Sequence, residues 1–167
     1  LGLSPVRQLN PELAMTYLNL LLLGHVLGTV ALVGGAFMLQ ILAVLASRSP
    51  VPADLVALSR QAAWIGPRVF LPAAVVIVAT GAGLASELRY ALGEPFLMIG
   101  LVVIVVAAAT GPAYLAPESS RISRLVTAEG EACPEARARL RRVFLVSRIE
   151  LLLLVVAVAA MVVKPSF

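Results

Sequence analysis

The fold of this chain is decided by residues 17–46, which read YLNLLLLGHVLGTVALVGGAFMLQILAVLA. A run of about 20 mostly apolar residues is long enough to cross the hydrocarbon core of a bilayer as a helix. This run is longer, and its few polar members include His25, the only histidine of the chain. The stretch therefore predicts a membrane-spanning helix that is tilted or that emerges at one end.

Two narrow faces of this predicted helix differ from the rest of its surface. At about 100° per residue, the polar residues His25, Thr29 and Gln40 fall within a sector roughly 60° wide. Small residues let helices approach closely in lipid, and polar groups in hydrocarbon need partners inside the protein. We therefore expect this helix to face the middle of a bundle. The small residues of the neighbouring sector are Gly24, Gly28, Ala31 and Gly35.

Composition identifies the class of protein. Of the 167 residues, 60% are hydrophobic and 13% are charged, and the mean hydropathy is +0.99. A soluble domain would carry about 25% charged residues, so the chain is predicted to be an integral membrane protein. A single cysteine, Cys133, excludes an intrachain disulfide and a cysteine-based zinc site.

Three further apolar segments complete the predicted architecture. Four spans with short connections predict an all-α, up-down four-helix bundle, with residues 1–167 forming one transmembrane domain. Pro67 and Pro72 are expected to bend the second helix near its inner end, and Pro112 is expected to kink the end of the third span. No internal repeat is evident. The predicted spans are residues 14–46, 62–85, 95–115 and 143–163.

The distribution of positive charge predicts the orientation. The first and third connections, with the helix borders beside them, hold ten of the 13 lysines and arginines. The positive-inside rule then places loops 47–61 and 116–142 in the cytoplasm and both termini outside. Loop 116–142 would include the arginine-rich start of the last helix. Because the arginines lie at membrane borders, the positive net charge does not indicate a nucleic-acid partner.

His25 is the first candidate ligand. At 1.5 Å per residue it would lie about 30 Å from the end of its helix near Ala46, and Met161 roughly 27 Å from the start of the last span. Histidine and methionine at similar depth can serve as the two axial ligands of haem iron. Three interpretations stay open for His25: a neutral ring bonded to a carbonyl, hydroxyl or water, a ligand of haem b or another metal, and a proton relay.

Glu150 is the second informative residue, because it lies about two turns inside the fourth span. Arg148 is about 160° away around that helix, so Arg68 of the second span is the better partner. The pair Arg68–Glu150 could fix the helix register, Arg68 or Arg148 could clamp a cofactor carboxylate, or Glu150 could belong to a proton path. Arg68 could instead extend to the membrane interface beside Trp64.

The ends of the chain carry a family resemblance. His25 followed by Gly34 and Gly35 resembles the first-helix pattern of a superfamily of small bacterial membrane proteins, which includes CopD-type copper-resistance proteins and four-helix HemJ-type protoporphyrinogen oxidases. The ending from SRIE at 147–150 to MVVKP at 161–165 is similar to the HemJ-type ending. The chain also resembles a related bacterial family of predicted integral membrane proteins.

The resemblance implies a bacterial inner membrane protein with haem at His25, and it matches Glu150 and Lys164 to family positions. HemJ-type proteins carry Trp and Lys just before the histidine, where this chain has NLLLLG at 19–24. We therefore expect no enzyme activity, and a HemJ-like oxidoreductase reaction if there is one. The expected partners are the lipid bilayer and other membrane subunits or a second copy of the chain.

The leading hypothesis is a haem b protein in electron transfer or porphyrin handling, with a candidate cofactor site at His25, Met161, Arg68 and Glu150. A second hypothesis is a cofactor-free accessory subunit of a larger respiratory or photosynthetic type of membrane complex, packed through its glycine face. A third is copper transport, which would need Met98 or Met161 to face His25.

Overall fold

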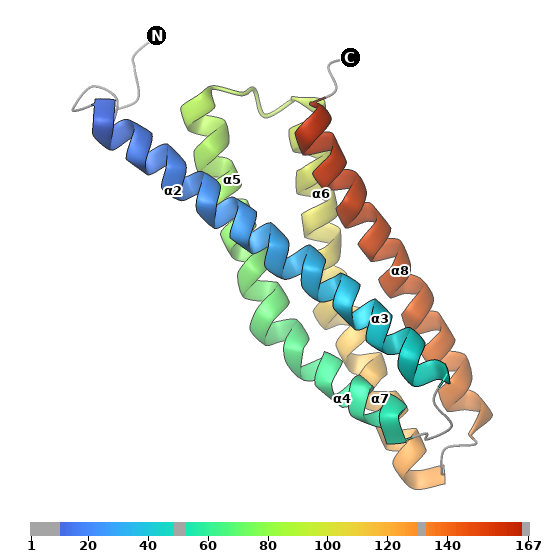
Figure 1. Ribbon diagram of the computed structural model, residues 1–167. Coiled ribbons are helices and arrows are strands. Elements are labelled where there is room, and N and C mark those ends of the chain that lie inside the picture. The colour runs from blue at the N-terminus through green and yellow to red at the C-terminus, as the bar shows by residue number, and fades with distance from the viewer. Residues whose placement is uncertain (1–10, 49–52, 130–132, 165–167) are drawn as a thin grey trace.

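The structure, a computed structural model, describes residues 11–48, 53–129 and 133–164. Within these residues it is helical apart from the turn at 89–94 and the single residues Cys133 and Lys164. Four rods lie side by side (Figure 1), and three of them contain a short π-helical segment. The rods are α2 (Pro11–Thr29), η1 (Val30–Gly34) and α3 (Gly35–Arg48); α4 (Ala53–Ile65), η2 (Gly66–Phe70) and α5 (Leu71–Leu88); α6 (Pro95–Thr110), η3 (Gly111–Leu115) and α7 (Ala116–Glu129); and α8 (Pro134–Val163).

The four rods run alternately up and down. α2 begins and α8 ends at the top of Figure 1, together with the turn that joins α5 to α6. We call this the Tyr90 end and the opposite one the Arg139 end. All four rods are long and apolar enough to cross a membrane. The predicted all-α, up-down bundle of four membrane-spanning helices is therefore confirmed, and a lipid bilayer is its environment.

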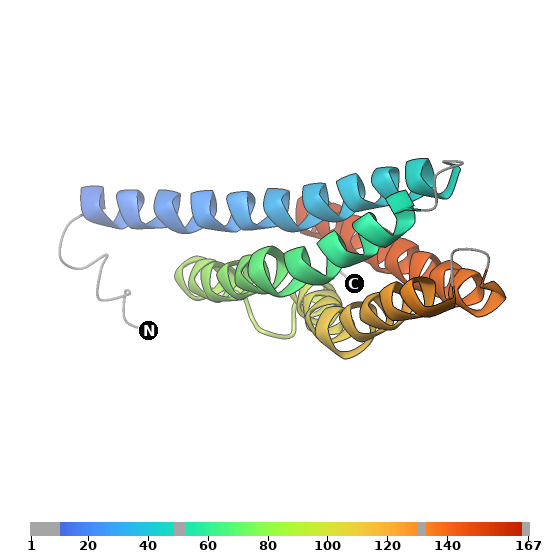
Figure 2. The ribbon, with the colours of Figure 1, turned by 90° about the horizontal axis from the view of Figure 1, so that it is seen from below.

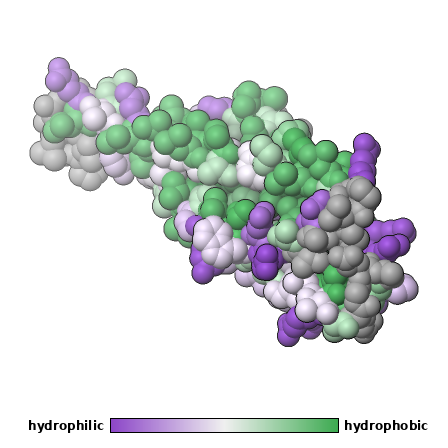
Figure 3. Space-filling view, turned by 60° about the horizontal axis from the view of Figure 1, so that its bottom comes forward, coloured by the Kyte–Doolittle hydropathy of each residue, from purple (hydrophilic) through white to green (hydrophobic). Residues whose placement is uncertain are grey.

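The centre of the bundle is built from small and medium-sized side chains. Large apolar side chains instead cover the outside, for example Leu22, Val102 and Leu152, each about half exposed or more. The space-filling view shows an apolar belt between hydrophilic ends (Figure 3). Such a distribution suits a protein whose surroundings are acyl chains. The buried central cluster is Leu32, Ala73, Ala74, Val103, Ile104, Ala107 and Leu154.

Segment 116–142, expected to be a loop, is helical over most of its length. The third rod continues as α7 to Glu129, and α8 begins at Pro134. Glu118 of α7 accepts hydrogen bonds from Arg121 one turn later and from Arg139 of α8, at 3.0 and 2.9 Å. These ion pairs, and the packing of α7 on α4 and α8, explain why the arginine-rich segment is helical.

The predicted bends take the form of π-helical turns. Pro67 and Pro112 have no backbone N–H, so they interrupt the regular i→i−4 bonding of their helices. In both rods a five-residue π segment begins at the glycine before the proline, and α-helix resumes after it. Seen from below, the first rod lies on one side of the bundle, and the other three rods lie on the opposite side of it (Figure 2).

Candidate functional site

His25 lies at the contact between α2 and α5, the first and second rods. Its Nδ1 is 3.1 Å from the carbonyl oxygen of Ile77 and 3.2 Å from the hydroxyl oxygen of Thr80. The Thr80 hydroxyl donates its one proton to the carbonyl of Val76, at 2.6 Å. Both neighbours of Nδ1 therefore accept, which assigns the proton to Nδ1. In the neutral ring, Nε2 then keeps its lone pair.

The sequence around His25 allows α5 to come close. A Cβ added to Gly81 would be 3.1 Å from Cε1 of the imidazole, so glycine at 81 makes room for the ring. A Cβ at Gly28 would lie 2.9 Å from Ile77 and 3.3 Å from the carbonyl oxygen of Ala73. The predicted face of small residues thus packs against α5, and the polar face beside it carries the imidazole.

The polar residues of the first rod do not converge on one point. His25 bonds to α5, whereas Nε2 of Gln40 donates to the hydroxyl of Ser147 on α8, at 2.6 Å. The hydroxyl of Thr29 donates a hydrogen bond to the backbone carbonyl of His25, one turn earlier in the same helix. The polar stripe therefore serves two separate helix contacts, one in each half of the bundle.

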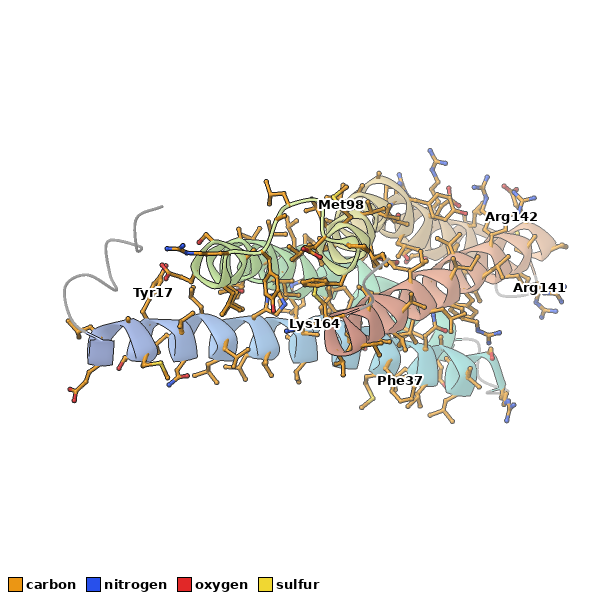
Figure 4. All side chains as sticks on the ribbon, turned by 90° about the horizontal axis from the view of Figure 1, so that it is seen from above. Tyr17, Phe37, Met98, Arg141, Arg142 and Lys164 are labelled. Carbon is orange, nitrogen blue, oxygen red and sulfur yellow. The ribbon has the colours of Figure 1, made fainter. Side chains whose placement is uncertain are left out.

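Met161 packs on a different pair of helices. Its methyl group lies against Gly100 of α6, and α6 and α8 form a pair as α2 and α5 do. Met161 therefore packs between α8 and α6, whereas His25 lies between α2 and α5. Met98 points away from the bundle (Figure 4) and is 46% exposed. The haem ligand pair and the copper path stay predictions.

The expected ion pair between Arg68 and Glu150 is not formed. The guanidinium of Arg68 lies over the ring of Trp64, 4.9 Å from its centroid, and Arg68 is exposed. A cation–π contact at the surface keeps the guanidinium charge outside hydrocarbon. This explains why Arg68 lies on Trp64 and not beside Glu150. Among the described residues, no hydrogen bond or ion pair holds Glu150.

Lys164, which the resemblance matched to a closing family lysine, caps the Tyr90 end. Its ammonium group donates to the hydroxyl of Tyr90 at 2.9 Å and lies 5.2 Å from the centre of that ring. Tyr90 in turn contacts Phe96 edge-to-face, with centroids 5.1 Å apart. These contacts tie the end of α8 to the α5–α6 turn.

The other feature of interest is a cavity of about 150 Å³ in the half of the bundle toward the Arg139 end. All four rods line it, mostly with apolar side chains. Glu150 lies in this lining together with three neutral polar residues, Gln40, Ser119 and Ser147. The carboxylate, a group that is costly to bury in lipid, thus borders an internal space.

All three π segments contribute to the cavity wall. Leu32 belongs to η1, Phe70 to η2 and Leu115 to η3. Two of the segments share a sequence pattern, because Gly66-Pro67 with Pro72 and Gly111-Pro112 with Pro117 have the same G-P-x-x-x-x-P spacing. Sequence reasoning noted Pro67, Pro72 and Pro112 but not Pro117, and so it missed the repeat, which was the available signal for a cavity. π-Helical turns are frequent at functional sites.

Comparison with known proteins gives one match. Residues 19–165 fit the model of a family described as "Predicted integral membrane protein (DUF2269)". No curated protein and no solved structure matches the chain. Among the described residues, no group of three histidine, cysteine or acidic side chains is placed to hold a metal ion. The family match covers most of the length, and so this chain belongs to the family of predicted integral membrane proteins described as DUF2269.

Proposed function

We propose that this protein binds haem b in the membrane, with His25 as the axial ligand, and acts in electron transfer or porphyrin handling. The observation that carries the proposal is the contact of His25 Nδ1 with the carbonyl oxygen of Ile77, at 3.1 Å. Histidines that bind metals usually donate their other ring N–H to a carbonyl or carboxylate. The Nδ1 contacts of His25 with Ile77 and Thr80 match that arrangement.

The residues of the chain would have distinct roles. Nε2 of His25 would bind the iron, and the Ile77 carbonyl would orient the ring and increase its basicity. Haem would supply one-electron chemistry. Met161, Arg68 and Glu150 are not joined to His25 by any described contact, so His25 is the one ligand that we assign.

The location completes the proposal. The ten arginines at or near the first and third connections support an orientation with the Arg139 end in the cytoplasm of a bacterial cell and both termini on the outer side of its inner membrane. Reporter fusions at the two termini, compared with a fusion in the 130–132 connection, would test this orientation. Fluorescence of a cytoplasm-specific reporter at a terminus would contradict it.

Absorption spectroscopy tests the cofactor. The protein is expressed with haem supplementation and purified in mild detergent, and a Soret band is expected in stoichiometric amount. His25→Ala should abolish the band. Gln40→Ala is the matched control, because Gln40 lies on the same polar face but bonds to Ser147 instead. A wild-type protein without a Soret band, or a band that His25→Ala leaves unchanged, would overturn the proposal.

The accessory-subunit hypothesis makes a different prediction from the same preparation. α2 packs chiefly on α5, and its outer side exposes Leu20, Leu23 and Leu27. Another membrane subunit could contact this apolar face, as could lipid. A cofactor-free protein that purifies with fixed partner chains, and still does so as His25→Ala, would favour the accessory role over haem binding.

A further inference from the structure

Glu150 lies within the apolar part of α8. The helix runs from Pro134 to Val163, but its first turns are arginine-rich, and Glu150 follows the start of the apolar span at Val143 by about 10 Å at 1.5 Å per residue. A carboxylate at such depth is costly unless a positive group or hydrogen-bond donors compensate it. As shown above, no described residue does so, and the carboxylate borders the cavity.

The size and lining of the cavity restrict the ligand. A protein cavity of about 150 Å³ with apolar walls accommodates a molecule the size of benzene, and this one has the same volume. Its wall includes Phe70, Phe144 and Leu154. The ring faces of phenylalanine attract cations as well as apolar groups. The lining therefore suits a ligand with an apolar body and one positive charge.

The polar groups of the wall suit an ammonium group better than a metal ion. Glu150 offers one negative charge, and hard metal ions usually take six or more oxygen ligands. Gln40 uses its amide nitrogen to donate to Ser147, which leaves its amide oxygen as an acceptor beside the same space. An ammonium group has several N–H donors and no acceptor, which matches a carboxylate and an amide oxygen.

We propose that this cavity is a binding site for a small organic cation, namely a protonated amine whose apolar body is about the size of one aromatic ring, with the amine held by Glu150. Residues of the π-helical turns η1, η2 and η3 line this space. None of the atoms that bond to His25 belongs to the cavity wall. The proposal therefore stands or falls independently of haem binding.

The test compares two probes of the same shape, benzylamine and benzyl alcohol. Binding is followed by chemical-shift changes of isotope-labelled protein in nanodiscs, with the resonances of cavity residues as the readout. Benzylamine at neutral pH carries the positive charge and benzyl alcohol does not. Benzylamine should bind about tenfold more tightly or better, because hydrogen bonds to charged groups are stronger than neutral ones.

Two variants assign the difference to Glu150. Glu150→Gln keeps the shape and removes the charge, so it should weaken benzylamine about tenfold and change benzyl alcohol by less than about twofold. Glu12→Gln is the matched control, since Glu12 is exposed near the Tyr90 end, and it should alter neither probe. Ala108→Leu adds bulk to the wall of the cavity and should weaken both probes together.

The outcomes are decisive in both directions. A preference for benzylamine that disappears in Glu150→Gln supports the proposal. Equal binding of the two probes to the wild-type protein would show an apolar cavity without charge recognition and would overturn it. So would a wild-type protein that binds neither probe, or a benzylamine preference that persists unchanged in Glu150→Gln.

Discussion

Two partly buried polar residues in the same bundle have opposite surroundings. His25, toward the Tyr90 end, sits at a close helix contact with a carbonyl and a hydroxyl at its Nδ1. Glu150, toward the Arg139 end, borders a cavity and has no described partner. The half toward the Tyr90 end gives His25 polar partners through close helix packing. The half toward the Arg139 end leaves space beside Glu150. The comparison teaches that burial of a polar residue in a membrane protein does not by itself indicate a ligand.

The largest expected effect comes from replacing each of these two residues by leucine, because the two substitutions should change the free energy of unfolding in opposite directions. Glu150→Leu should raise the free energy of unfolding in micelles by about 2–3 kcal/mol, because it removes an uncompensated carboxylate from the membrane interior. His25→Leu should lower it, because Ile77 and Thr80 would lose their partner and a branched chain would press on Gly81. Equilibrium unfolding in mixed micelles measures both. Destabilisation by Glu150→Leu would mean that the carboxylate is compensated after all.

Close packing at the His25 half can be broken directly. Gly28→Val should destabilise the protein by about 1–3 kcal/mol, since the added carbons would overlap Ile77 and the Ala73 backbone. Gly34→Ala, in the same rod, is the control, because a Cβ there meets nothing within 4 Å. Thermal unfolding in detergent, compared between these two variants, checks the prediction. A loss of stability as large for Gly34→Ala would contradict it.

A smaller effect is expected where the first rod reaches the cavity. Gln40→Leu removes the hydrogen bond to Ser147 and should destabilise by about 0.6 kcal/mol, the average for hydrogen bonds between membrane helices. The double variant with Ser147→Ala should cost little more than either single change, because the two residues share one bond. Strictly additive losses in this double-mutant cycle would show that the two side chains act separately.

The smallest effect belongs to the ion pairs at the Arg139 end. Arg139→Gln removes contacts to Glu118 and Glu135 and should cost about 0.3–0.5 kcal/mol at low salt, the usual contribution of exposed ion pairs on helices. The loss should shrink as salt rises, since these groups are near the surface. Unfolding measured at two ionic strengths checks this. A loss that does not depend on salt would point to packing rather than charge.

Much of the fold could be predicted because its cause is local in the sequence. Four apolar segments give four spanning helices, and the regular spacing of Gly24, Gly28 and Gly35 predicted a close helix contact. The α5 face that meets them could not be predicted, since it depends on how two helices rotate about each other. The contact found at His25, to a carbonyl and a hydroxyl, was one of the interpretations considered.

The rest depended on details of geometry that periodicity does not encode. Arg68 was expected beside Glu150 because Arg148 points about 160° away, but the side chain lies on Trp64, which was the alternative considered. The helix at 116–129 was missed because its many charged residues are also typical of a loop, although pairs such as Glu118–Arg139 stabilise it. Three π segments line the cavity, and two of them carry a repeated glycine-proline pattern in the sequence.

The small side chains at the centre of the bundle have a practical consequence for handling the protein. In lipid, helices gain little from excluding water, so cohesion comes from the fit of one backbone on another. The first rod relies chiefly on α5 for that fit along α2. Short-chain detergents that insert between helices should therefore detach this rod first, and long-chain detergents or native lipid should be chosen when the protein is extracted.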